Sequence, residues 1–139
     1  QDDLEKYRIR EVAYDDWNAG ELEHRIAPLV DIVNYPQNMK HMSPAAKDWE
    51  AEILKKTIYD PNPVISWMLS CTSLYIDANG NYKPVKDGDP SSSKRIDGVI
   101  TSIMAFSRLK TYLSGDPVNT TQDAIDMLKF FSFYGRDTN

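Results

Sequence analysis

The first 35 residues carry the pattern that most restricts the fold of this chain. Residues 7–14 (YRIREVAY) are rich in aromatic and β-branched side chains, which favours a strand. Asn18 and Glu21 have the spacing of a helix capping box, and residues 30–35 (VDIVNY) again favour a strand. Two strands joined by one helix over so short a stretch predict a parallel βαβ unit.

The middle of the chain predicts a helix followed by a β-hairpin. Ser43 and Pro44 have the residue types preferred at the N-cap and N1 positions, so a helix is expected to begin there. Residues 72–85 alternate as strands do, and Asn79-Gly80 at their centre suits a two-residue type I′ turn.

Two helices are predicted for the remainder. Residues 96–113 carry apolar side chains at helical spacing, and residues 120–134 form a shorter amphipathic pattern. We therefore expect one α/β domain over residues 1–115 and a helical tail over residues 116–139.

Composition limits the class of protein. The 139 residues are 41% apolar, enough for one globular core, and no apolar run approaches the roughly 20 residues that span a bilayer. The net charge of −5 argues against holding DNA through bulk positive charge, so any such contact depends on a local basic patch or on metal ions. The single cysteine, Cys71, cannot form an internal disulfide and fits a reducing compartment.

Two aspartates occupy positions where ligand sites form. Asp15 directly follows the first predicted strand, and sites in open α/β sheets lie at the carboxyl ends of strands. Asp97 lies in the first turn of the long predicted helix. The simpler interpretation is that Asp97 compensates the helix dipole, worth about 0.3–1 kcal/mol, and that Asp15 and Asp16 lie in a solvated turn. Spacing alone favours this simpler interpretation.

Four short motifs around these residues are more specific, because they occur in a defined order. They are VAYDDWNA (residues 12–19), NPVISWM (62–68), DANGNYKPVK (77–86) and KRIDGVITSIMAFSR (94–108). Together they resemble the C-terminal nuclease domain of the large terminase subunit of tailed phages, in the HK97-like group. The resemblance extends over residues 9–109.

The resemblance implies an α/β, ribonuclease-H-like nuclease fold, of which this chain is the C-terminal portion with the first strands absent. In that family, acidic residues hold two divalent metal ions, Mg²⁺ or Mn²⁺, at the phosphodiester that is cut. The resemblance assigns Asp15 and Asp97 as catalytic, metal-binding residues and leaves Asp16 as a neighbour. The family's first catalytic aspartate lies on the first strand. The complete protein is therefore expected to cut concatemeric double-stranded DNA during packaging, whereas this chain alone is not.

Basic residues surround the second of these aspartates. Lys83, Lys86, Lys94 and Arg95 follow the predicted hairpin and the loop that leads to Asp97. They are either ordinary solvated side chains or a rim that contacts the DNA backbone beside the metal ions. The sequence leaves both interpretations open.

Two other functions also remain open. The chain could be an interaction module that kept the fold without the chemistry, or another ribonuclease-H-like enzyme such as a resolvase or transposase. The presence of both Asp15 and Asp97 favours the nuclease over the module. The Asn-Pro…Trp-Met and Lys-Pro-x-Lys motifs point away from a resolvase or transposase.

The resemblance also implies partners. They are double-stranded phage DNA, the upstream ATPase motor with the rest of the nuclease domain, the portal and the small terminase subunit, in the cytoplasm of the host and without a membrane. No Gly-x-x-x-x-Gly-Lys-Ser/Thr motif occurs in this chain, so the motor is expected elsewhere. Residues 7–14 are expected to present an open strand edge, because the family's first strand would pair there. We therefore expect this chain alone to self-associate.

Overall fold

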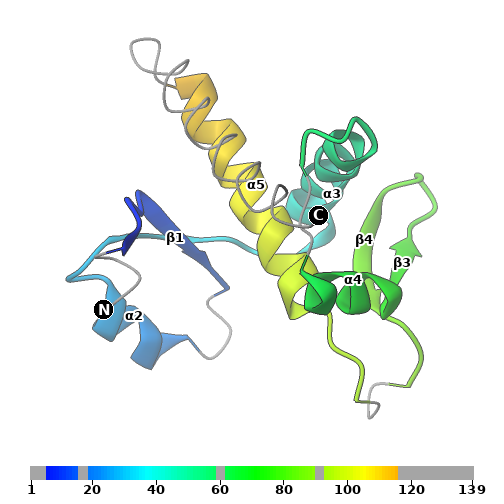
Figure 1. Ribbon diagram of the computed structural model, residues 1–139, viewed down its shortest axis with the longest axis horizontal. Coiled ribbons are helices and arrows are strands. Elements are labelled where there is room, and N and C mark those ends of the chain that lie inside the picture. The colour runs from blue at the N-terminus through cyan, green and yellow to red at the C-terminus, as the bar shows by residue number, and fades with distance from the viewer. Residues whose placement is uncertain (1–5, 16–18, 59–61, 90–92, 116–139) are drawn as a thin grey trace, which may run out of the picture.

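The structure is a computed structural model that describes residues 6–15, 19–58, 62–89 and 93–115. Its long last helix lies between a small parallel sheet on one side and two helices with a hairpin on the other (Figure 1). The elements in chain order are β1 (Glu11–Tyr14), α2 (Gly20–Ile26), β2 (Asp31–Asn34), α3 (Met39–Leu54), α4 (Pro63–Ser70), β3 (Thr72–Ile76), β4 (Tyr82–Lys86) and α5 (Asp97–Gly115).

The βαβ unit is confirmed. β1 and β2 pair in parallel, with Glu11 opposite Asp31 at the start of the ladder, and α2 connects them. A strand over the whole of residues 7–14 is wrong, because β2 has only four residues and can pair with only four residues of β1. The expected cap at Asn18 lies outside the described residues.

α3 begins earlier than the sequence predicts. Its N-cap is Asn38, whose side-chain oxygen accepts a hydrogen bond from the backbone N–H of His41 at 3.1 Å. Ser43 is buried inside the helix instead, and its hydroxyl accepts the backbone N–H of Tyr82 at 3.1 Å. The predicted start at Ser43 and Pro44 is wrong because Asn38 supplies an earlier cap and the Ser43 hydroxyl bonds to the hairpin.

The β3–β4 hairpin is confirmed, but its turn is not a two-residue type I′ turn. Residues 77–81 connect the paired strands. The Asp77 carboxylate accepts the backbone N–H groups of Asn79 at 2.8 Å and of Asn81 at 2.9 Å. Only Gly80, with a φ of 74°, has the left-handed conformation among these residues. The Asp77 side chain therefore stabilises a longer loop than the Asn-Gly pair predicts.

Tyr82 joins the hairpin to α3. Besides the backbone bond to Ser43, its hydroxyl donates to the carboxylate of Glu50. Burial and this hydrogen bond raise the pKa of Tyr82 to about 12, so the hydroxyl stays protonated as a donor at neutral pH. The hairpin is thus held to the same helix that builds the core.

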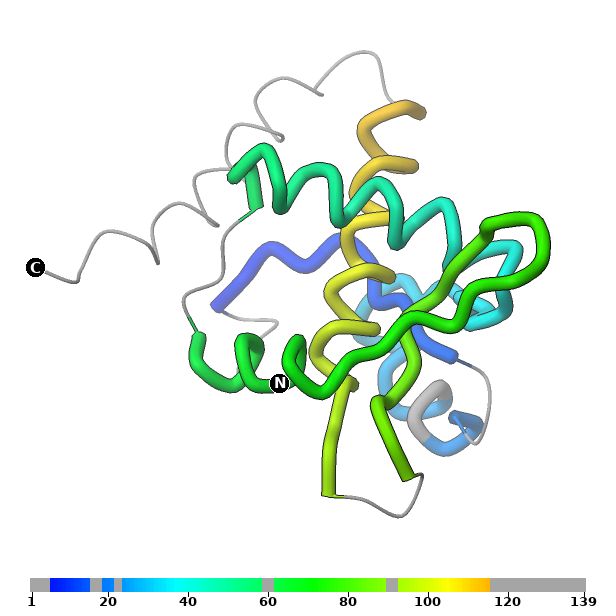
Figure 2. The backbone as a smooth tube through the Cα atoms, turned by 90° about the vertical axis from the view of Figure 1, so that its right-hand side faces the viewer, coloured from blue at the N-terminus to red at the C-terminus, as the bar shows by residue number. Residues whose placement is uncertain are grey.

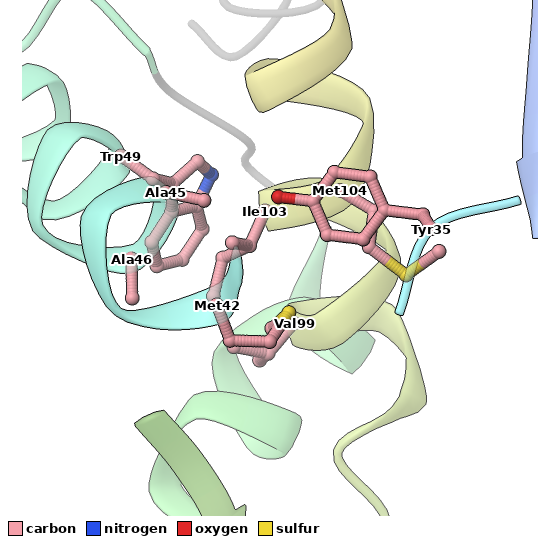
Figure 3. Close-up of a cluster of buried hydrophobic side chains, with 8 residues drawn as sticks. All are labelled: Tyr35, Met42, Ala45, Ala46, Trp49, Val99, Ile103 and Met104. Carbon is pink, nitrogen blue, oxygen red and sulfur yellow. The ribbon is translucent and has the colours of Figure 1, made fainter. Parts of the chain in front are cut away.

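The core forms where α3 crosses α5 (Figure 2). Figure 3 shows side chains of the two helices facing one another around this crossing. Met42, Val99 and Ile103 are each 1% exposed. The full cluster is Tyr35, Met42, Ala45, Ala46, Trp49, Val99, Ile103 and Met104. Residues from the predicted apolar side of the long helix therefore fix its orientation.

A groove lies beside β1. In the described part of the chain β1 pairs with β2 alone, so no strand lies along its second edge. Residues 7–13 and α5 enclose a groove of about 690 Å³. Its lining includes Ile9, Val12, Ala13, Met104, Leu109 and Leu113. The sequence predicted an open edge at this strand but not the groove beside it.

None of the helices in the described ranges combines the length and the apolar character needed to cross a membrane. The predicted tail over residues 116–139 lies outside the described residues.

Candidate functional site

Asp15 and Asp97 each lie at the end of a regular element. Asp15 follows β1 directly and is half-buried, whereas Asp97 is the first residue of α5 and is exposed. Each is therefore attached to an ordered backbone, as a residue that holds a ligand needs to be.

An ion pair sets the direction in which β1 runs along α5. The Arg108 guanidinium donates to both carboxylate oxygens of Glu11, at 2.5 and 2.9 Å, and both side chains are about three-quarters buried. Two residues further along β1, Ala13 packs against the core cluster that contains Met104. The strand therefore runs from the level of Arg108 towards the N-terminus of α5. Figure 1 shows β1 running beside α5 toward the end at which this helix begins.

This direction places both aspartates toward one end of the β1–α5 unit. From Glu11 to Asp15 a strand advances roughly 13 Å. From Arg108 back to Asp97 a helix advances roughly 16 Å. The two advances are similar, so we expect residues 15 and 97 at comparable levels along the unit. Their convergence on one metal ion stays a prediction.

The backbone of Asp97 is held by close packing against α4. The N–H of Gly98 lies 3.2 Å from the sulfur of Met68. A Cβ at position 98 would come within 2.7 Å of both Met68 Sδ and Ile65 Cδ1, so these two side chains would have to shift to admit any other residue. The carbonyl of Asp97 also accepts the Thr101 hydroxyl at 2.9 Å. The first turn of α5 is thus fixed while the carboxylate at its start is exposed.

The carboxylate oxygens of Asp15 and Asp97 are the type of ligand that a hard divalent cation prefers. Carboxylate oxygens are the ligands that Mg²⁺ and Mn²⁺ prefer, and water or substrate phosphate usually completes their coordination. Within the described ranges no group of three or more His, Cys, Asp or Glu side chains is placed to hold a metal ion. Asp16 lies outside those ranges. Asp15 and Asp97 are thus ligands of the right chemical kind, and their place in a metal site stays a prediction.

The four basic residues do not form one continuous row. Lys83 and Lys86 are three positions apart on β4, so their side chains point to opposite faces of the strand. Lys83 donates to the carbonyl of Gln37 at 3.3 Å, on the side of α3. Lys94 and Arg95 immediately precede α5 and lie within three residues of Asp97. This leaves Lys94 and Arg95 as the basic residues closest in sequence to the candidate site.

A hydrogen-bonded network surrounds Lys94. Its ammonium forms an ion pair with Asp87, whose other carboxylate oxygen accepts the Ser73 hydroxyl at 2.9 Å. The hydrogen bonds from Lys94 and Ser73 lower the pKa of Asp87, and the bond to Asp87 raises the pKa of Lys94. Both groups are therefore charged at neutral pH.

Comparison with models of protein families shows to which family the chain belongs. Residues 4–112 match the model of the terminase large subunit, endonuclease domain. The chain belongs to this terminase family. A comparison with curated proteins found no match.

A solved structure shows the same fold. The crystal structure of the HK97 bacteriophage large terminase superimposes with a TM-score of 0.64 over 77% of this chain, at 21% sequence identity. The matched region is 22% of that terminase chain, so the present chain spans about a fifth of its relative's length. The ribonuclease-H-like α/β fold class predicted from the sequence is confirmed.

Sequence reasoning missed two features of the terminase domain. Asp87 and Ser73 bond around Lys94, and Met68 packs on Gly98 beside Asp97. Both contacts join residues more than six positions apart, and the spacing of apolar residues along the sequence does not predict such contacts. The Asp-Gly pairs at residues 87–88 and 97–98 were the available signal, since glycine marks a turn or a close approach.

Proposed function

We propose that this chain supplies Asp15 and Asp97 to a two-metal endonuclease site that cuts concatemeric double-stranded DNA during phage genome packaging. Membership of the terminase endonuclease family already indicates an endonuclease. The observation that carries the finer proposal is the course of β1 along α5. The Glu11–Arg108 pair and the packing of Ala13 on the core support the expectation that the two aspartates lie toward one end of the unit.

The residues have separate roles in this proposal. Asp15 and Asp97 would hold the divalent ions, Mg²⁺ or Mn²⁺. When bound, such ions stabilise the attacking and leaving oxygens of the phosphodiester. Lys94 and Arg95, just before α5, neutralise DNA phosphates and set the register of the backbone. Lys83 and Lys86 point to opposite faces of β4, so only one of these two lysines extends this contact along the strand.

The proposal extends to the whole protein. The ATPase motor and the rest of the nuclease domain belong to the complete large subunit, and the portal and the small terminase subunit are its partners. A third acidic ligand comes from the part of the domain that precedes β1.

Cleavage of plasmid and linear DNA tests the proposal. The complete large subunit is compared with this chain alone, in Mg²⁺, in Mn²⁺ and after EDTA treatment. We expect cutting by the complete subunit that EDTA abolishes, and none by this chain, because the proposal takes one ligand from the rest of the nuclease domain. A folded complete subunit that binds DNA but leaves it intact in both metals would indicate a non-catalytic module. Metal-dependent cutting by this chain alone would show that other residues complete the site.

A further inference from the structure

We propose that Asp87 is a positioning residue that holds Lys94 against the DNA backbone at the entrance to α5. The inference rests on the proposed function, because it assigns a role to a residue beside that site. Asp87 belongs to none of the residues assigned above to metal or DNA.

Asp87 is itself held firmly. Its backbone N–H donates to the carbonyl of Cys71 at 2.8 Å, and its carboxylate accepts the hydroxyl of Ser73. These bonds attach Asp87 to the junction between α4 and β3, where Cys71 is buried. The carboxylate that meets Lys94 is therefore a fixed point on the hairpin base.

The chain makes a sharp turn at the residue that follows Asp87. Gly88 has a φ of 79°, a conformation that side chains other than glycine rarely adopt. A Cβ built on Gly88 would lie 3.9 Å from Lys94 Nζ, so the turn brings the ammonium next to the backbone of this residue. The Asp87–Lys94 ion pair thus joins the end of β4 to the segment that enters α5, three residues before Asp97.

The pair is open enough to meet DNA. The side chains of Lys94 and Asp87 are 39% and 46% exposed. An ammonium group has three N–H donors, so one can bond to Asp87 while the others bond to phosphate. Asp87 is held by Ser73 and by the Cys71 carbonyl, so the pair restricts the positions that the Lys94 ammonium can take.

Single substitutions in the complete large subunit test the inference. In Asp87→Asn the cation remains but loses its charged anchor. We expect the cleavage rate at saturating DNA to fall roughly 10-fold, because a lysine that is no longer held in place positions the DNA backbone less accurately. DNA affinity should not weaken, since a negative charge near the DNA has been removed. Asp87→Glu should recover part of the rate because it restores the charge.

The substitution Lys94→Met tests the phosphate contact of the lysine itself. It should lower the cleavage rate and also reduce the slope of log binding constant against log salt by about 0.9, the value for one lost phosphate contact. In the Asp87→Asn/Lys94→Met double variant the rate should equal that of Lys94→Met alone, because Asp87 acts through Lys94.

A second exposed ion pair gives a matched control. Lys110 and Asp48 pair between α5 and α3 with similar exposure. Asp48→Asn and Lys110→Met should leave the cleavage rate unchanged.

Three results would overturn the inference: an unchanged rate in Asp87→Asn, rate losses of the two single variants that multiply in the double variant, or an unchanged salt slope in Lys94→Met. The slope is measured on uncut DNA in EDTA. It therefore judges the Lys94 contact even if wild type fails to cut, which would contradict the proposed function instead.

Discussion

Asp97→Asn in the complete large subunit is expected to lower the DNA cleavage rate roughly 1,000-fold, about 4 kcal/mol of transition-state stabilisation. Asparagine has nearly the same size as aspartate and keeps one oxygen, but it lacks the charge that holds a divalent cation. Because Asp97 is exposed at the start of α5, the substitution should leave folding intact.

The loss should lie in the chemical step. Removal of a negative charge next to the DNA does not weaken binding when no cation is bound, so affinity measured in EDTA should be equal to or tighter than that of wild type. Asp48→Asn, at an exposed carboxylate of α3 that pairs with Lys110, serves as the control and should cut at the wild-type rate. Cleavage by Asp97→Asn within a few-fold of wild type would remove Asp97 from the catalytic residues.

This chain alone is expected to self-associate. The second edge of β1 has no strand beside it in the described residues, and the apolar groove next to it is open. Covering apolar surface is worth roughly 25 cal/mol per Å², and unpaired strand edges readily recruit another strand. Light scattering over a concentration series should show the mass rise from 15.9 kDa toward that of a dimer.

A charge placed at the groove should prevent this association. Val12→Lys puts an ammonium group on β1 within the groove lining, and we expect it to remain a monomer at every concentration. Leu54→Lys is the control, because Leu54 is 75% exposed at the end of α3, and it should associate as wild type does. Circular dichroism checks that both variants fold. A constant mass of 15.9 kDa for wild type over the whole series would contradict the expectation.

Local patterns predicted those parts of the fold that local interactions determine. The strand, helix and strand of the βαβ unit follow from residue types within about ten positions, and the hairpin follows from alternation around a turn. The start of α5 at Asp97 was also close to the expected position.

The errors arose where a distant residue used a group that the sequence had assigned locally. Ser43 reads as an N-cap, but its hydroxyl bonds to the backbone of Tyr82, 39 positions away. Asn79-Gly80 reads as a type I′ turn, but the Asp77 carboxylate builds a longer loop. Propensity gives no information about such competition, because the competing partner is known only once the fold is formed.

The candidate site also has features that local sequence predicts and features that depend on distant residues. The position of Asp15 after a strand and of Asp97 at a helix start could be read from the sequence. The Glu11–Arg108 pair that directs β1 along α5 joins residues 97 positions apart and could not. The same holds for the packing of Met68 on Gly98.

Anomalous diffraction from crystals of the complete large subunit soaked in Mn²⁺ tests the central claim most directly. The account predicts a manganese peak at roughly 2 Å from a carboxylate oxygen of Asp97, with a carboxylate oxygen of Asp15 on the same ion or on its partner ion. Manganese bound without either aspartate, or Asp15 and Asp97 on opposite faces of the domain, would contradict it.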